Sequence, residues 1–401
     1  MTNPMVDDIL SSVGWSDLPD AGTAGSEAAR RALGQIPKLA PKLALVFGSS
    51  WLQQEELLAG IRAVLPTTPL LGESTAGEIT PQGPASHRCV LVLFFGKGMV
   101  CQVGMSLSVD RAPRDAGQQL AFAATQGCDG LPRAGFLLLG DGLMTSYAEV
   151  IRGLQEVLGT GTMIAGGIAG DDRRFAQTYQ YCNDHVATGA VAGVLFAGAV
   201  KIGVGSGHGF APISKPRRIT KASANILYEL DQRPAASVYE EYFGADVMER
   251  LRHEGMTRQT IAYPLGIQQE ATDPWLLRNV VSFGSDGSLL CSSEVREGAW
   301  LQLMIGSRQR ALDAAQQAAQ AAVRGMNRIS CVLVFDSVIR QILLGSRYAA
   351  VEIDRIRDVI GTATPMAGCY TYGEQAPVTA RMTADRISMQ TGSVLVIAIG
   401  T

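Results

Sequence analysis

Two stretches of this chain, about three hundred residues apart, carry almost the same ten letters. PLLGESTAGE occupies 69–78 and PMAGCYTYGE occupies 365–374; both begin with proline, place glycine three residues later and end in Gly-Glu. A third stretch, TMIAGGIAGD at 162–171, ends in Gly-Asp and has Ala165 where the other two have glycine. A repeated supersecondary unit must pack against its copies, so this feature constrains the fold more than any other.

The segments around the three stretches repeat one order of elements. Apolar strands at 43–47, 136–142 and 331–338 come first, and helical spacing follows at 51–65, at 147–159 and up to about 360. The repeated loop comes next, and then β-rich runs, which include 89–95, 186–196 and 393–400. An Ala-rich helix precedes each first strand, at 24–35, 115–126 and 309–324.

This α-β-α-β-β-β unit predicts an α/β fold with mixed sheets. Its βαβ part requires a crossover and parallel neighbours, whereas the hairpin that follows requires antiparallel ones. Because one copy cannot bury both faces of its sheet, we expect the units to stack in an αββα-like arrangement.

The length of 401 residues favours more than one packed unit. Residues 1–38 are predicted to be an N-terminal extension with the first covering helix, 39–210 a domain of two repeat units, and 211–401 a C-terminal domain. The stretch 208–299 lacks the repeat. We expect the domain boundary within 208–217, where glycine, proline and basic residues concentrate.

Composition excludes several classes of function. The formal net charge is −3 and Lys and Arg form no runs, which argues against nucleic acid or an anionic membrane as partner. The apolar stretch 186–200 ends at Lys201 and is shorter than a spanning helix needs. Seven scattered cysteines without a CxxC pair, and an N-terminus without a signal-peptide pattern, indicate a cytoplasmic protein with reduced thiols.

The repeated loop lies at the carboxyl end of a strand, where open α/β sheets usually bind their ligands. Hydroxyls, carboxylates and tyrosines concentrate there and at the neighbouring strand ends, so we expect a pocket for a small polar ligand. The candidate residues are Ser49, Ser50, Glu73, Ser74, Thr75, Asp141, Asp171, Tyr370, Tyr372 and Glu374. The alternative is structural: the glycines turn corners, and Glu78 and Glu374 cap nearby backbone.

Several motifs together resemble the FIST family (F-box and intracellular signal transduction domains) over about residues 40–395. They are MAGCYTYGEQAP at 366–377, ELDQRPA at 229–235, and GHGFAP at 207–212 with RRIT at 217–220. The family's usual Leu-Asp-Gly-x-Pro-Ala turn reads LDQRPA here. Its Cys/Gly-Arg pairing after the C-terminal strand is replaced by FDSVIRQILLG, which leaves Arg340 as a further candidate ligand contact.

The resemblance implies a sensory protein that binds a small ligand, such as an amino acid, between its N- and C-terminal parts. It also implies a separate output partner, such as a histidine kinase or a cyclic-di-nucleotide enzyme. Some stand-alone bacterial members are haem-binding nitric-oxide sensors. For that alternative His208, flanked by glycines, is the candidate haem ligand. The helix at 309–324 offers a surface for a homodimer.

A catalytic alternative is a hydrolase built from Ser49 or Ser50, Asp141, Asp171 and His208. No G-x-S-x-G, HExxH or Cys-His signature supports it, so the sequence predicts a protein that is not an enzyme. The glycine-rich GVGSGHG at 203–209 lacks the Lys-Ser/Thr of a phosphate-binding loop, which argues against nucleotide binding.

Overall fold

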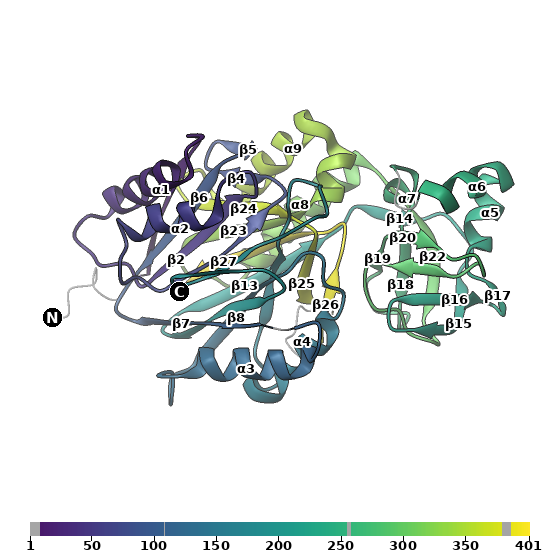
Figure 1. Cartoon of the computed structure of the whole chain (residues 1–401), viewed down its shortest axis with the longest axis horizontal. Coiled ribbons are helices and arrows are strands. Elements are labelled where there is room, and N and C mark those ends of the chain that lie inside the picture. The colour runs from purple at the N-terminus through teal and green to yellow at the C-terminus, as the bar shows by residue number, and fades with distance from the viewer. Residues whose placement is uncertain (1–8, 108, 255–257, 379–385) are drawn as a thin grey trace.

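The computed structural model describes residues 9–107, 109–254, 258–378 and 386–401. They form a large body and a smaller lobe, seen on the left and right of Figure 1. The predicted mixed α/β class with repeated units is confirmed. Among the helices in these ranges, none is both long enough and apolar enough to cross a lipid bilayer.

Three units of one design make up the body, and each runs β-α-β-α-β, hairpin, β. The first contains β1 (Leu10–Ser16), α1 (Ala21–Gln35), β2 (Leu43–Ser49), α2 (Gln54–Arg62), β3 (Leu70–Thr75), β4 (Glu78–Thr80), β5 (Gly83–Ala85) and β6 (Cys89–Phe95). The second contains β7 (Met99–Ser106), α3 (Pro113–Thr125), β8 (Arg133–Gly140), α4 (Tyr147–Leu158), β9 (Ile164–Ile168), β10 (Gln180–Cys182), β11 (His185–Ala187) and β12 (Val191–Gly198).

The third unit is interrupted by the lobe. It contains β13 (Lys201–Gly207), α8 (Arg308–Val323), β23 (Ile329–Ser337), α9 (Val338–Ile360), β24 (Met366–Thr371), β25 (Gly373–Pro377), β26 (Ile387–Gln390) and β27 (Val394–Gly400). Helix α9 is broken at Gly345, whose φ is 69°. The lobe is therefore an insertion between the first strand and the first helix of this unit, and residues 308–401 return to the body.

Each unit gives its hairpin to the sheet of another unit. The three sheets of the body have the orders β1-β6-β2-β3-β10-β11, β7-β12-β8-β9-β25-β26 and β13-β27-β23-β24-β4-β5. The hairpin of the second unit thus completes the first sheet, that of the third unit completes the second, and that of the first unit completes the third. This cyclic exchange gives the body a pseudo-three-fold arrangement and binds the N-terminal and C-terminal units into one structure.

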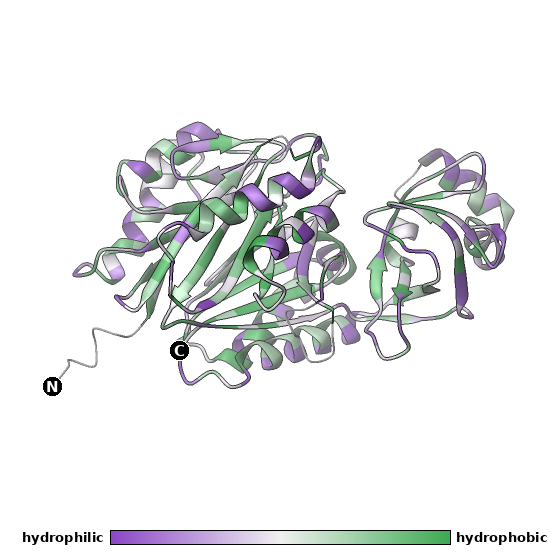
Figure 2. Ribbon diagram, turned by 90° about the horizontal axis from the view of Figure 1, so that it is seen from below, coloured by the Kyte–Doolittle hydropathy of each residue, from purple (hydrophilic) through white to green (hydrophobic). Residues whose placement is uncertain are grey.

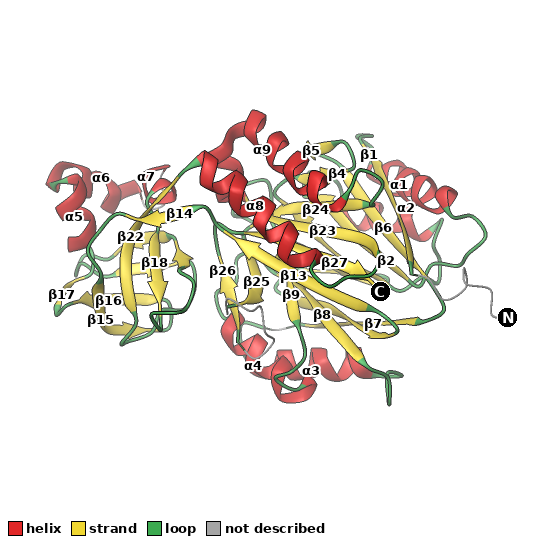
Figure 3. Cartoon of the chain, turned by 180° about the vertical axis from the view of Figure 1, so that it is seen from behind, coloured by secondary structure: helices red, strands yellow, loops and turns green. Residues whose placement is uncertain are grey.

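The stacking differs from the predicted αββα pair because three sheets, rather than two, pack around a common centre. One apolar core joins the inner faces of all three, with Phe47, Phe196 and Phe335 among its buried side chains. Outer cores lie between each sheet and its own helix pair, α1 and α2, α3 and α4, or α8 and α9. Figure 3 shows the helices on the outside, and Figure 2 shows that hydrophilic residues concentrate on them.

The Ala-rich helices pack unusually close to the sheets. A Cβ atom added to Gly14 in β1 would lie 2.0 Å from the Ala28 carbonyl oxygen of α1, and one on Gly205 in β13 would lie 2.0 Å from that of Ala318 in α8. Glycine in the strand and alanine in the helix permit this close approach of the two backbones. This close packing explains why the first helix of these units is rich in alanine.

We therefore expect Gly14→Ala to lower the free energy of unfolding by about 1–3 kcal/mol or more. The added Cβ would strike backbone atoms of α1 and force this helix away from the sheet. Chemical denaturation measures this change. Gly34→Ala is the matched control, since Gly34 lies in α1 with nothing within 4 Å of an added Cβ. It should leave stability unchanged or raise it by up to about 1 kcal/mol; equal losses in both variants would contradict the packing argument.

The lobe is a small β-rich domain with its own core, which includes Tyr239 and Phe283. Its elements are β14 (Phe210–Pro212), β15 (Arg217–Ser223), β16 (Ile226–Leu230), β17 (Arg233–Pro234), α5 (Ser237–Phe243), α6 (Ala245–Glu254), α7 (Arg258–Ala262), β18 (Leu265–Gln268), β19 (Leu276–Arg278), β20 (Val280–Phe283), β21 (Leu289–Cys291) and β22 (Trp300–Gly306). Strands β14 and β22 pair antiparallel and bring the two ends of the insertion together.

The structure also corrects one detail of the repeat. Gly166, not Ala165, occupies the position of Gly72 and Gly368. In all three cases an added Cβ would strike the carbonyl oxygen of the neighbouring parallel strand, at 2.3 Å for Gly72, 1.9 Å for Gly166 and 1.8 Å for Gly368. The second loop is therefore one residue shorter than the other two between this glycine and its closing acidic residue.

Candidate functional site

The repeated strand ends lie inside the body, not on a ligand crevice. Glu73, Ser74, Thr75, Tyr370 and Glu374 are each 0% exposed. The Ser74 hydroxyl donates to the Gly170 carbonyl at 2.8 Å and accepts from the Tyr179 amide at 2.9 Å. The Tyr370 hydroxyl has no hydrogen-bond partner among the described residues.

The closing glutamates make the same contacts in two of the units. The Thr75 hydroxyl donates to Glu78, and the Thr371 hydroxyl donates to Glu374 at 2.8 Å. Each glutamate also accepts a backbone amide just before the last strand of its unit, from Arg88 at 2.9 Å and from Ser393 at 3.3 Å. These contacts match the structural alternative, in which the glutamates cap backbone.

Burial raises the pKa of Glu78 and of Glu374 to about 8, against the hydrogen bonds that lower it. Both acids therefore hold a proton in the folded protein at neutral pH. Unfolded, they lose it near their ordinary pKa of 4.5. The folded state binds more protons than the unfolded state between these values, so stability must fall as the pH rises towards 8.

We expect the thermal midpoint to drop by several degrees between pH 6.5 and pH 8. His208 does not contribute in this window. Burial and Arg340 lower its pKa to about 4 in the folded protein, so it makes stability rise with pH only up to the ordinary histidine pKa of 6.5. The Glu78→Gln, Glu374→Gln double variant keeps a neutral polar group at both sites and should reduce the slope of the profile, while Glu73, whose pKa burial also raises, keeps part of it. Calorimetry at both pH values measures it, and an unchanged slope in the variant would assign the effect to other groups.

Glu73 lies where the three units meet. Its Oε1 is 3.8 Å from the Cys369 sulfur, and an added Cβ on Gly167 would lie 3.3 Å from the same oxygen. Glu73, Gly167 and Cys369 each follow one of the three equivalent glycines. The same position of all three units therefore lies at this point of the body. Burial raises the pKa of Glu73 well above its ordinary value, and its Oε2 has no partner within the described chain. Burial therefore disfavours the charged form of this carboxyl group.

Four of the predicted residues meet at the surface loop 171–177. The Asp171 carboxylate accepts the amides of 175, 176 and 177 at 2.7–3.0 Å and the hydroxyl of Tyr372. Burial raises the pKa of Asp171, but these hydrogen bonds outweigh it and lower the pKa overall. Ser49 and Ser50 donate to Asp172 at 3.2 and 2.9 Å. All of these groups hold the loop itself.

The two remaining strand-end candidates are also bound to the protein. Asp141 accepts the Thr178 hydroxyl at 2.9 Å and the Gly189 amide at 3.0 Å. The fully buried Arg340 donates to Asp336 at 2.9 Å, to Glu352, and to the carbonyls of His208 and Ala311 at 2.6 and 2.9 Å. Its guanidinium joins β23, α8 and α9 and is not open to a ligand.

His208 links the body to the lobe. Its Nδ1 accepts the Phe210 amide at 3.0 Å, so its Nε2 carries the proton and donates to the Trp275 carbonyl at 3.0 Å. Both ring nitrogens are thus occupied, and His208 as arranged does not fit an axial haem ligand. His208 makes no hydrogen bond with Ser49, Ser50, Asp141 or Asp171 in the described chain. The residues proposed for a hydrolase therefore do not form one site.

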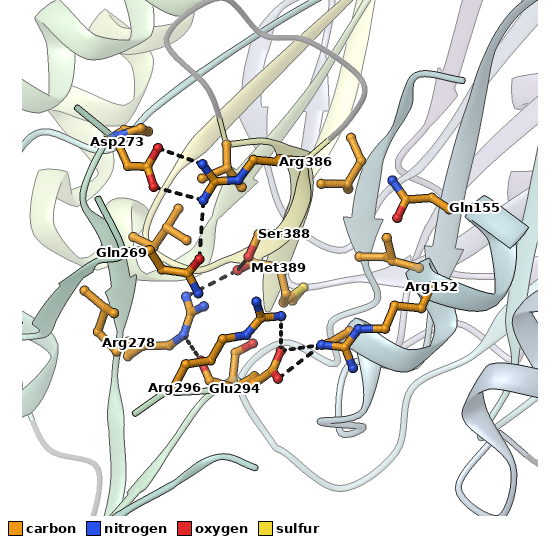
Figure 4. A pocket seen from close by; sticks show the side chains of 18 residues that line it. Arg152, Gln155, Gln269, Asp273, Arg278, Glu294, Arg296, Arg386, Ser388 and Met389 are labelled. Atoms are coloured by element: carbon orange, nitrogen blue, oxygen red, sulfur yellow. Dashed lines mark hydrogen bonds and ion pairs between the residues drawn. The ribbon is translucent and has the colours of Figure 1, made fainter. Parts of the chain in front are cut away.

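A cleft of about 220 Å³ lies between the body and the lobe (Figure 4). The body contributes Arg152 and Gln155 from α4, and Arg386 with the strand β26 that follows it. The lobe contributes residues of β18 and β19 and the loop between β21 and β22. The hairpin exchange creates this wall, because it places β26 at the edge of the second sheet beside the lobe.

Arg278 is the distinctive residue of the cleft. It is 4% exposed, yet it makes no ion pair with a carboxylate in the described parts of the chain. Its Nε donates to the Glu294 carbonyl at 2.8 Å, and its Nη1 to the carbonyls of Leu277 and Met389 at 2.8 and 3.3 Å. Burial lowers the pKa of Arg278 to about 10, which still leaves it charged at neutral pH.

The other three arginines of the cleft are paired. Arg386 binds both oxygens of Asp273, at 2.9 Å each. Arg152 and Arg296 both bind Glu294, at 3.3 and 3.2 Å. Within the described residues, the wall therefore holds one buried guanidinium, Arg278, whose donors meet carbonyl oxygens and no carboxylate, and this geometry favours an anionic ligand.

Sequence reasoning did not find this cleft. Its lining comes from segments near 152, 278, 294 and 386, which only the folded chain brings together. One signal was present: Arg278 interrupts the apolar run WLLRNVV at 275–281. A charged residue inside a buried strand needs a partner or a function.

Curated relatives are distant. An uncharacterised protein of Mycobacterium bovis is 24% identical over 382 residues, which cover 92% of this chain and 94% of that protein. An uncharacterised protein of Methanocaldococcus jannaschii is 26% identical over 283 residues, 65% of this chain and 53% of the relative. One of Mycobacterium tuberculosis is 27% identical over 55% of this chain and 56% of its own length. The match thus spans about half the length of the last two.

Solved structures resemble the chain weakly. PurL of Thermotoga maritima complexed with ATP is 10% identical and matches with a TM-score of 0.24, over 98% of this chain and 71% of that chain. Phosphoribosylformylglycinamidine synthase II from the same organism is 11% identical, also with a TM-score of 0.24, over 98% of this chain and 72% of that one. Scores this low carry no conclusion about this protein.

Family models match most of the chain. The FIST N domain model matches residues 42–233, which run from β2 of the first unit through the second unit and into the lobe. The FIST C domain model matches 235–377, which contain most of the lobe and part of the third unit. The motifs of the repeated loop and of the lobe turn lie within these matches. The chain therefore belongs to the FIST family, with an N and a C domain of that family.

Proposed function

We propose that this protein is a sensor that binds a small carboxylate-bearing ligand, an amino acid or a similar molecule, in the cleft between body and lobe. FIST domains are generally sensory, small-ligand-binding domains of signal transduction. The observation that carries the proposal is Arg278, a buried guanidinium without a carboxylate partner in the described chain. A ligand carboxylate accepts the N–H groups that its Nη2 leaves free.

The size of the cleft fits a small metabolite. Its volume of about 220 Å³ is below the roughly 300–1,000 Å³ of pockets for drug-sized ligands. The lining combines polar groups, among them Arg278 and Gln155, with apolar side chains such as Ile151 and Met389; Figure 4 shows the polar residues and Met389. This mixture is typical of sites that orient a small molecule by a few polar contacts.

A bound ligand would contact both the body and the lobe, which explains how binding becomes a signal. Contacts with Gln155 on α4 and Arg278 on β19 favour one relative position of the two parts, and a ligand shifts their equilibrium by its differential affinity. A separate output protein, such as a histidine kinase or a cyclic-di-nucleotide enzyme, would read that position. Catalysis plays no part in this proposal.

A thermal-shift screen with amino acids and small carboxylic acids tests the proposal. A ligand of the folded state raises the midpoint by an amount that grows with its concentration. Hydrogen exchange with the stabilising compound should then slow in α4 and β19 and leave the loop 171–177 unchanged. No stabilisation by any compound of the screen, or protection confined to the loop, would contradict the proposal.

A further inference from the structure

We infer that the cleft selects a small carboxylic acid with an apolar chain and without an ammonium group. The inference rests on the proposed function and narrows the class of ligand that it names. It follows from which donors and acceptors of the cleft are still open, and from the side chains that face them.

The carboxylates that could hold an ammonium group are already occupied. Asp273 receives Arg386 on both oxygens, and Glu294 receives Arg152 and Arg296. Burial raises the pKa of Glu294, but Arg296 and Arg152 lower it more, so the group stays ionised and paired. The ammonium of a zwitterionic amino acid would have to displace a guanidinium or remain without a charged partner.

The charged group of the cleft that is still open is a donor. The Nη2 of Arg278 has no hydrogen-bond partner in the described parts of the chain, whereas its Nε and Nη1 are bound to carbonyls. The Nε2 of Gln155, on the opposite wall, is buried and has no partner in the described ranges. Donors that lack acceptors match the oxygens of a carboxylate.

Apolar side chains form much of the remaining wall. They are Ile151, Ile267, Leu276, Ile387 and Met389. A branched aliphatic chain attached to the carboxylate would bury its apolar surface against these side chains. The carboxylate would meet Arg278, and the chain would lie against these residues.

Isothermal titration with a matched pair of compounds tests the inference. Leucine and 4-methylpentanoate share the carboxylate and the branched chain, and they differ in the ammonium group. We expect 4-methylpentanoate to bind at least about tenfold more tightly, because the ammonium of leucine loses its hydration without gaining a carboxylate. Ala148→Phe fills the cleft without changing its charges and should abolish binding of both compounds.

The outcomes separate this inference from the proposed function. Leucine binding as tightly as 4-methylpentanoate, or more tightly, with the loss in Ala148→Phe intact, overturns the inference and leaves a ligand site in the cleft. No binding of either compound to folded wild-type protein overturns the inference. Binding that persists unchanged in Ala148→Phe places the ligand elsewhere and overturns both.

Discussion

Replacing Arg340 by methionine is expected to lower the free energy of unfolding by about 3–5 kcal/mol at pH 7, the loss seen when one partner of a buried ion pair is removed. Arg340, Asp336 and Glu352 are all 0% exposed. Without the guanidinium, two buried carboxyl groups lose their compensating charge, and the carbonyls of His208 and Ala311 lose their donors. Urea denaturation of the purified protein measures the loss.

Two further variants isolate the cause. Arg355→Met removes a partly exposed partner of Asp313 and should cost no more than about 1 kcal/mol. Adding Asp336→Asn and Glu352→Gln to Arg340→Met removes the uncompensated charges and should recover much of the loss. A loss below 1 kcal/mol in Arg340→Met, or no recovery in the triple variant, would show that the buried charges do not control stability here.

The sequence contains enough to predict the units of the body but not their exchange. Hydrophobic spacing depends on local structure, and it correctly indicates three copies with an Ala-rich helix before β2, β8 and β23. It does not show that a further strand, β1, β7 or β13, begins each unit. Which sheet a hairpin joins depends on contacts between distant segments. The pairing of Glu78 with Cys369, and of Glu374 with Gly167, has no counterpart in local pattern.

The repeated decapeptides show the same limit on a smaller scale. Letter matching places Ala165 opposite Gly72 and Gly368, because it aligns the last residues of the loops. The backbone instead requires glycine where the next strand approaches most closely, and Gly166 meets that requirement with a shorter loop. Close packing, rather than the closing acid, defines the equivalent positions.

The predicted ligand-binding residues at the strand ends are buried inside the body instead of lining a surface pocket, for a related reason. Polar residues at strand ends are typical of ligand crevices in open sheets, but here the chain runs on from those ends into hairpins that pair with a neighbouring sheet. Ser74, Thr75 and Glu374 bind protein groups instead of a ligand. The cleft that contains Arg278 arises where the inserted lobe lies beside α4 and β26. Its lining comes from several distant segments, so no single stretch of sequence predicts it.

Arg278 is the residue on which the proposed sensor depends most. Arg278→Gln should weaken binding of a small carboxylate by roughly 30-fold or more, since loss of one partner from a buried, hydrogen-bonded charge pair costs about 2–5 kcal/mol. Arg278→Lys keeps the charge but loses the two-pronged donor geometry, so its affinity should lie between those of Arg278→Gln and wild type. Titration calorimetry of each variant gives the dissociation constants.

Arg296→Gln is the matched control, because Arg296 lines the same cleft with a side chain that is 51% exposed and already paired with Glu294. Its removal should change the affinity less than about fivefold, as expected for an exposed ion pair. Equal losses in Arg296→Gln and Arg278→Gln would mean that the cleft attracts anions only by its general charge. Unchanged affinity in a folded Arg278→Gln variant would remove the guanidinium from the site. A specific contact requires that the arginine without a carboxylate partner in the described chain controls binding, since the other three arginines already direct N–H groups to carboxylates.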